Sequence, residues 1–211
     1  MSRTLIPTRM ADRTSTDHAE LDALLDEVLV AHIGLSLEEG PLVIPTGFAR
    51  AGDRLLFHGS TGSRWMRALA DGAPACVTVT ALDAIKVARS GFESGMRYRS
   101  ACLFGTCTML TGDEAVRALD AFTDRVLPGR TGEIRPSTGK ELAATMTLAL
   151  PIAEWSLKTA DGFPEDPDSD IAGEAWAGVV PLVTGYGDPV PSPDLRAGIE
   201  VPASVHRLIG H

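Results

Sequence analysis

The sequence has no apolar run long enough to cross a membrane and no pair of cysteines at metal-binding spacing. A membrane-spanning helix needs about 18 or more consecutive apolar residues, and the first twenty residues also lack the apolar centre of a secretory signal. The chain has 3 cysteines, Cys76, Cys102 and Cys107, with no CxxC pair among them. We interpret them as reduced, buried thiols of a cytoplasmic protein with no membrane partner.

Positive charge and aromatic residues are also scarce. The 211 residues include 19 Lys and Arg against 28 Asp and Glu, and the formal net charge of -9 argues against a nucleic-acid binder. Aromatic residues make up 5% of the chain and hydrophobic residues 44%, a composition typical of globular proteins. A local basic pocket for one small anion is still compatible with this composition.

Short β-type runs dominate the chain and are joined by tight turns. Apolar spacing predicts helices from Asp17, over residues 63–70, from about Asp113 to Pro128, and after Thr138, where Glu141 completes a capping-box pattern. Strands are predicted at 31–37, 41–49, 54–59, 75–82, 84–88, 98–110, 147–152 and 154–160. These elements predict one mainly β domain with helices, an antiparallel barrel or sandwich over residues 1–185. The Pro- and Gly-rich tail 186–211 shows little periodicity.

The stretch FHGSTGSRW, residues 57–65, joins a strand to a helix. It places two glycines, three hydroxyl side chains and Arg64 at the start of the helix, and these groups suit a phosphate. The Walker A and Rossmann glycine patterns are both missing. The alternative interpretation is a flexible turn in which Ser63 caps the helix.

The stretch SGFESGMRYRSA carries several arginines in an acidic protein. Strand alternation puts Arg97 and Arg99 on one face and Tyr98 and Ser100 on the other. Clustered guanidinium groups indicate a nearby anion. Ordinary surface arginines, paired with carboxylates such as Glu93, are the alternative.

Three segments, taken together and in order, carry a family resemblance. They are VIPTGFARAGDRLLFHGSTGSRWMRALADG, CVTVTALDAIKVARS and YRSACLFG. They resemble the flavin-binding split-barrel family related to pyridoxamine 5'-phosphate oxidase, in particular its flavin-nucleotide-binding and nitroimidazole-resistance-type branch. The resemblance extends over about residues 10–185. It implies a Greek-key split β-barrel and a homodimer with FMN bound at the dimer interface.

The resemblance also implies roles for individual residues. Ser63 and Arg64 match the pair that holds the FMN phosphate, and His58 and Gly59 match a strand end beside the flavin. The remaining matches are Val43, Ile44, Pro45 and Thr46 along the ring, Tyr98, Arg99 and Ser100 on a strand that reaches the cofactor, and Trp176, which closes over the flavin from the partner subunit.

Two departures from the family pattern affect the expected chemistry. Arg97 stands where close relatives usually have Asn, and Trp65 stands where a second basic residue often follows the phosphate-binding arginine. The C-terminal segment has no convincing match to the family's pyridoxal-phosphate-binding residues. We therefore do not expect oxidation of pyridoxamine phosphate.

The resulting expectation is an FMN-dependent oxidoreductase that acts on a small, electron-poor substrate. In such an enzyme the flavin supplies the redox chemistry and the protein supplies orientation and electrostatics. His58 is the candidate proton donor or acceptor, because the ordinary pKa of histidine lies close to physiological pH. The alternatives are a structural role for His58, a flavin-binding sensor or store without turnover, a deazaflavin-dependent reductase, and a flavin-free scaffold.

Overall fold

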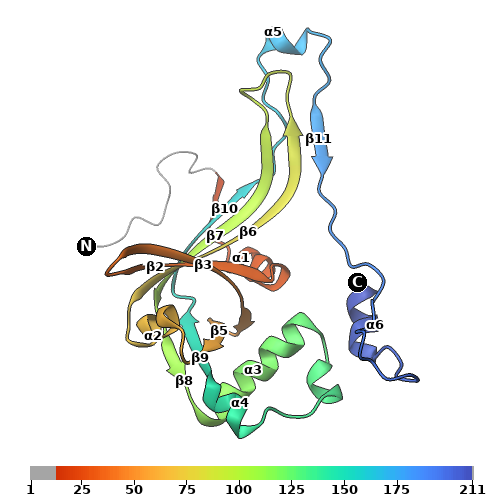
Figure 1. Cartoon of the computed structure of the whole chain (residues 1–211). Coiled ribbons are helices and arrows are strands. Elements are labelled where there is room, and N and C mark those ends of the chain that lie inside the picture. Colours follow the sequence, from red (N-terminus) through yellow and green to blue (C-terminus); the bar gives the residue numbers. More distant parts are fainter. Residues whose placement is uncertain (1–12, 211) are drawn as a thin grey trace. The chain divides into compact units, whose positions relative to one another are not determined.

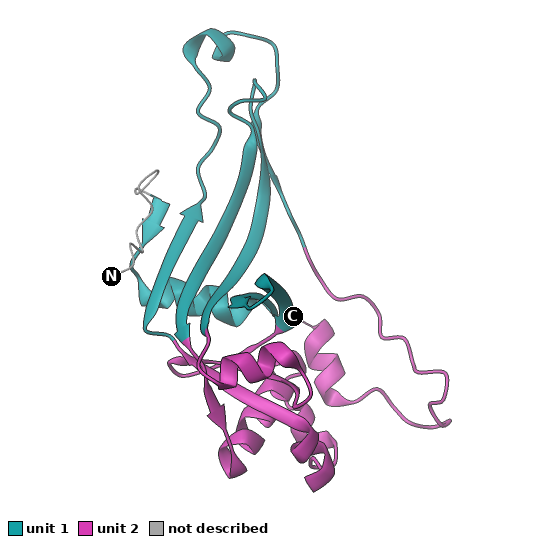
Figure 2. Ribbon diagram, turned by 60° about the vertical axis from the view of Figure 1, so that its left-hand side comes forward, with its two compact units in different colours: residues 1–46, 74–105, 152–183 teal, residues 47–73, 106–151, 184–211 magenta. Residues whose placement is uncertain are grey.

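The computed structural model describes residues 13–210 of the chain. It divides into two compact units, each with its own antiparallel sheet (Figures 1 and 2). Unit 1 comprises residues 1–46, 74–105 and 152–183, and unit 2 comprises residues 47–73, 106–151 and 184–211. Each unit is thus assembled from three separate segments of the chain.

The sheet of unit 1 contains seven strands. Six follow the order β1-β10-β7-β6-β2-β3, and β11 pairs with β6 beyond the end of β2. Their bounds are β1 Thr14–Ser15, β2 Val30–Leu37, β3 Gly40–Gly47, β6 Pro74–Val87, β7 Gly95–Thr106, β10 Glu154–Ala160 and β11 Gly178–Pro181. The two long strands β6 and β7 lie next to each other at the centre of this order.

Helix α1, His18–Glu27, supplies the core of unit 1. It begins at Asp17, whose carboxylate accepts a hydrogen bond from the amide of Ala19 at 2.8 Å. Its leucines Leu21, Leu24 and Leu25 are fully buried, and the helix packs against β6. The short α5, Asp168–Ile171, lies in the acidic loop that follows β10.

The sheet of unit 2 has four strands in the order β4-β5-β9-β8. Their bounds are β4 Ala49–Ala51, β5 Arg54–Ser60, β8 Thr108–Leu110 and β9 Thr145–Pro151. Helix α3, Gly112–Val126, covers one face, where Leu56 and Ala149 pack with Ala118. Helix α2, Arg64–Ala70, covers the other face, where Met66 approaches Gly59.

Three short helices complete unit 2. They are η2 Arg130–Glu133, α4 Gly139–Ala144 and α6 Ala203–Ile209. Thr138 and Glu141 form a full capping box at the start of α4. Helix α6 is fixed to η2, because the amide and hydroxyl of Ser204 both donate to the carboxylate of Glu133.

The predicted fold class is confirmed, since the chain is mainly β with helices and the sheets are antiparallel. Residues 75–82 and 84–88 were predicted as two strands, and they form the single strand β6. Residues 98–110 were predicted as one strand, and they divide at Cys107 into β7 and β8, which belong to different sheets. An apolar run carries no signal for such a change of partner strand.

The C-terminal part of the chain contains the helix α6, which no periodicity in the sequence had indicated. The predicted boundary between residues 185 and 186 stays a prediction, and the first 12 residues of the predicted domain lie outside the described residues. Among residues 13–210, no helix combines the length and the apolar character needed to cross a membrane.

Candidate functional site

The junction between β5 and α2 is a tight loop that its own hydrogen bonds hold in shape. The amide of Ser63 donates to the carbonyl of Ser60 at 2.9 Å, and the amide of Gly62 donates to the Ser60 hydroxyl at 3.1 Å. The guanidinium of Arg67 donates to the carbonyl of Gly62 at 3.1 Å. The loop is therefore preorganised within unit 2.

The predicted phosphate-binding pair lies at the end of this loop. Ser63 is the N-cap residue of α2, but its hydroxyl makes no capping hydrogen bond, so the cap that the sequence offered as an alternative is not formed. Arg64, the first residue of α2, is exposed. Gly59 precedes the loop, and a Cβ there would lie 3.1 Å from the Cγ of Met66. A hydroxyl and a guanidinium thus stand together at an accessible surface.

His58 lies on the face of the unit 2 sheet that α3 covers. It is paired directly with Thr147 across β5 and β9, and its ring meets the ring of Phe122 edge-on with centroids 4.2 Å apart. Its Nδ1 is buried and has no hydrogen-bond partner among the described residues. Burial lowers the pKa of His58, because the charged imidazolium loses hydration there. The ring is therefore neutral at physiological pH.

The predicted ring-contacting residues lie on β3, an edge strand of unit 1. Val43 is 62% exposed and Pro45 is exposed as well, whereas Ile44 and Thr46 are half-buried on the other side of the strand. Proline is tolerated here because an edge strand does not need every amide for pairing. Only every second residue of VIPT therefore presents its side chain to the exposed side.

The predicted residues of β7 also alternate. Tyr98 and Ser100 lie on one side of the strand, directly opposite Ala160 and Lys158 of β10. Arg99 lies on the other side, where its guanidinium forms ion pairs with Glu27 at 2.8 Å and with Asp83 at 2.6 Å.

Arg99 makes four hydrogen bonds to these two carboxylates. It donates from Nε and Nη2 to Asp83 and from Nη1 and Nη2 to Glu27, over 2.6 to 3.1 Å. The hydrogen bonds with Asp83 and Glu27 raise the pKa of Arg99. Contact between this guanidinium and a cofactor would require exchange of an ion pair, and the cofactor-binding role of Arg99 stays a prediction.

Several predicted cofactor residues share one side of the unit 1 sheet, which we call the open face. Gly34 is paired with Cys76, and a Cβ on Gly34 would lie 4.0 Å from the Cγ2 of Val43. The Thr78 hydroxyl lies 3.7 Å from the Sγ of Cys102. The open face comprises His32, Gly34, Val43, Cys76, Thr78, Tyr98, Ser100, Cys102 and Phe104. Small side chains in its centre leave room for a flat ligand or a partner surface.

Trp176 precedes β11 and is 65% exposed. Its indole ring lies over Gly178, where a Cβ would be 2.8 Å from the ring. The exposed ring is compatible with the predicted contact to a flavin in a partner subunit, which stays a prediction.

The predicted residues therefore form two groups, one in each unit. Unit 2 brings together His58, Gly59, Ser63 and Arg64 around the end of β5, and unit 1 carries Val43–Thr46, Tyr98–Ser100 and Trp176. Glu27 and Thr147 were not predicted from the sequence. An isolated threonine in the apolar run TLALPI was the only signal for the latter. Within the described part of the chain, no three His, Cys, Asp or Glu side chains are grouped to hold a metal ion.

One protein family and several solved structures are similar to this chain. A family model described as pyridoxamine 5'-phosphate oxidase matches residues 17–159. The structure of the FAD and heme binding protein from Mycobacterium smegmatis is 54% identical, with a TM-score of 0.91, over 93% of this chain and 97% of that chain. The flavocytochrome Anf3 from Azotobacter vinelandii is 32% identical, with a TM-score of 0.90, over 96% of this chain and 94% of that chain.

A more distant match shows the fold alone. A candidate 5-nitroimidazole antibiotic resistance protein from Bacteroides thetaiotaomicron is 18% identical, with a TM-score of 0.58, over 69% of this chain and 85% of that chain. No curated protein sequence matches the chain significantly. The chain thus matches solved structures of the split-barrel fold class that the sequence predicted.

Proposed function

Because the chain belongs to the pyridoxamine 5'-phosphate oxidase family, we propose that it binds a flavin and acts as an oxidoreductase on a small, electron-poor molecule. The observation that carries the proposal is the 54% identity to a FAD and heme binding protein over 97% of that protein's chain. At this identity and coverage, the cofactor chemistry of the two proteins is expected to be shared.

The chemical form of the flavin is part of the proposal. The family resemblance in the sequence implied FMN, whereas the Mycobacterium smegmatis relative is described as binding FAD. We propose FAD, with FMN as the alternative. Both carry phosphate, so the same protein groups serve either cofactor at that end.

The residues at the β5–α2 junction fit the phosphate of a flavin. The Ser63 hydroxyl is not used to cap α2, and Arg64 places a permanent positive charge beside it at the surface. The open face of unit 1, taken by itself, offers Val43 as an apolar surface and Ser100 as a hydrogen-bonding group.

A bound flavin would supply hydride or electron transfer, and the protein groups would orient it and control its surroundings. Arg64 would neutralise phosphate charge. His58 is neutral and packed against Phe122. A neutral imidazole can accept a proton, whereas a proton donor would need the charged imidazolium, which is the minor form at physiological pH. We therefore assign His58 a proton-accepting or positioning role.

We further propose that the protein is a homodimer that pairs through the open face. Besides Val43, which is 62% exposed, strand alternation places Val30 on the same side as His32 and Leu82 on the same side as Thr78. Val30 is 48% exposed and Leu82 is 39% exposed. Exposed apolar side chains on one sheet face are typical of an interaction surface. Light scattering of the purified protein tests this proposal, and a monomeric mass at micromolar concentration would exclude a stable dimer.

Heme is a second candidate cofactor, because two similar structures are a FAD and heme binding protein and a flavocytochrome. Histidine is a common axial ligand of heme iron. His58 is neutral with an unpartnered Nδ1 among the described residues, and His32 is exposed on the open face. Hemin titration should give a Soret band that either His58→Ala or His32→Ala abolishes. A band unchanged in both variants would exclude both histidines as ligands.

The central test is the visible spectrum of the purified protein, followed by mass identification of the released chromophore. We expect flavin bands, and we expect Arg64→Ala to weaken flavin affinity by about tenfold or more, since it removes a charge-assisted contact to phosphate. Arg54→Ala is the matched control, because Arg54 is also an exposed arginine of unit 2 and pairs with Glu114. A colourless protein that binds neither FAD nor FMN would refute the proposal.

A further inference from the structure

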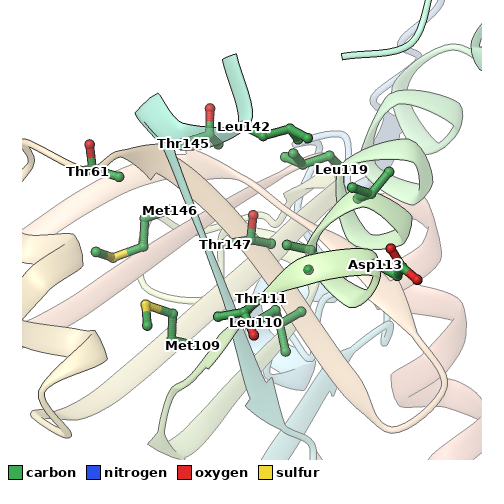
Figure 3. Close-up of a pocket in the computed structure, with 13 residues that line it drawn as sticks. Thr61, Met109, Leu110, Thr111, Asp113, Leu119, Leu142, Thr145, Met146 and Thr147 are labelled. Atoms are coloured by element: carbon green, nitrogen blue, oxygen red, sulfur yellow. The ribbon is translucent and has the colours of Figure 1, made fainter. Parts of the chain in front are cut away.

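Unit 2 contains a pocket of about 410 Å³ beside the buried strand β9. The ends of β8 and β9, the first turns of α3 and the helix α4 surround it (Figure 3). Its wall is mostly apolar and includes Met109, Leu110, Leu119, Leu142 and Met146. Apart from Thr61, which belongs to the loop predicted to suit a phosphate, none of the residues that line it was assigned to the flavin.

Thr147 is the unusual residue of this pocket. Its side chain is only 3% exposed, and its hydroxyl has no hydrogen-bond partner among the described residues. Figure 3 shows Thr147 in the middle of the lining residues, with its hydroxyl pointing to the side where Leu142 lies. A buried hydroxyl without a partner destabilises the folded protein, whereas a valine of the same shape would not.

The other polar groups of the pocket differ from Thr147. The hydroxyl of Thr145 donates to the carbonyl of Glu141 at 2.9 Å, and the hydroxyl of Thr61 lies 3.4 Å from the carbonyl of Ala144. Asp113 is the one charged residue in the wall, and it carries a negative charge. Thr111 also lines the pocket and its hydroxyl does not cap α3, but Thr111 is exposed. The pocket therefore disfavours anions, and among its lining residues Thr147 carries the buried hydroxyl without a partner in the described part of the chain.

We propose that this pocket binds a small, neutral and largely apolar molecule with one hydroxyl or carbonyl group, which hydrogen-bonds to Thr147. The volume lies within the range of about 300–1,000 Å³ that is typical of small-molecule sites. The apolar wall buries the body of the ligand, and the threonine hydroxyl fixes its orientation. A lone water is a poorer occupant, because it needs at least two polar partners.

The test compares 2-naphthol with naphthalene, two fluorescent probes that differ by one hydroxyl. Titration of the full-length purified protein should show tighter binding of 2-naphthol. Thr147→Val should lower the affinity for 2-naphthol by between about twofold and tenfold, because one hydrogen bond is lost. The affinity for naphthalene should not change. Thr147→Ser keeps the hydroxyl and should keep the preference.

Thr145→Val is the matched control, because Thr145 lines the same pocket but its hydroxyl is already bonded to Glu141. It should not change the preference for 2-naphthol. Without ligand, Thr147→Val should raise Tm by about 2–4 °C, since it removes an unsatisfied buried hydroxyl. The change in Tm thus shows whether the Thr147 hydroxyl is unsatisfied in the free protein, as a ligand-binding group would be, or already bonded within the fold.

Three results would overturn the proposal. The first is equal affinity for both probes, or no binding of either. The second is a lower Tm for Thr147→Val, which would mean that the hydroxyl already has a partner in the free protein. The third is displacement of both probes by hemin with a Soret band that changes in Thr147→Val, which would assign the pocket to heme.

Discussion

Arg99 is bonded to carboxylates that lie 72 and 16 residues away in the sequence, Glu27 at the end of α1 and Asp83 on β6. A single guanidinium therefore ties a helix and two strands of unit 1 together. The sequence placed Arg99 correctly on the face opposite Ser100, but it offered Glu93 as a partner in place of these two carboxylates.

Asp83→Asn tests the contribution of this arginine. The ion pair is about one-third exposed, with side chains at 29% and 35%, so solvent screening limits its strength. We expect a loss of about 1 kcal/mol in the free energy of unfolding, measured by urea denaturation. Glu114→Gln, which breaks the more exposed pair with Arg54, should change it by less than about 0.5 kcal/mol.

The same variant separates two roles of Arg99. If Arg99 only holds the elements of unit 1 together, Asp83→Asn leaves the flavin spectrum and the flavin affinity unchanged. If Arg99 exchanges partners to contact the cofactor, loss of Asp83 changes flavin affinity beyond its effect on stability.

At the scale of elements, α4 shows how local sequence defines a short helix. Thr138 accepts from the amide of Glu141, and the Glu141 carboxylate accepts from the amide of Thr138 at 2.7 Å. Arg135 adds two further bonds to the same carboxylate. A six-residue helix has little intrinsic stability, so these contacts decide whether it forms.

Thr138→Ala should therefore destabilise the protein by about 1 kcal/mol, the typical effect of losing an N-cap. Differential scanning calorimetry measures it as a fall in Tm of about 2–4 °C. Ser137→Ala, one residue earlier and exposed, is the control and should change Tm little. Equal Tm values for both variants would show that α4 does not depend on its capping box.

At the scale of the whole molecule, several carboxyl groups of unit 2 have a lowered pKa. The Arg135 guanidinium lowers the pKa of Glu141 to about 2. The Ser204 hydroxyl lowers the pKa of Glu133, and Thr131 lowers that of Asp124. Each group has a lower pKa in the folded protein than in the unfolded chain. Its contribution to the free energy of unfolding is therefore complete above the pKa of the unfolded chain, and it is lost as the pH falls through the pKa of the folded protein.

We therefore expect Tm to fall as the pH is lowered from about 5 to 2. Glu141→Gln should flatten part of this dependence, because glutamine keeps the capping box but does not titrate. Thermal melts at several pH values measure both effects. A Tm independent of pH over this range would contradict the assignment.

The sequence by itself determined many of the elements and the family resemblance. The capping residues at Asp17 and Thr138, the alternation along β7, and the segments around VIPT, FHGSTGSRW and YRSACLFG are local patterns, and local patterns are readable without a fold. They sufficed for the mainly β class and for the candidate residues at the end of β5.

Tertiary structure alone decided the long-range partners. It joined residues 75–87 into one strand, divided 98–110 between two sheets, and fixed α6 on Glu133. It also packed the half-buried His58 against Phe122 and left the Thr147 hydroxyl without a hydrogen-bond partner among the described residues. Burial and pairing depend on segments far apart in the chain, and no single stretch of sequence encodes which of them meet.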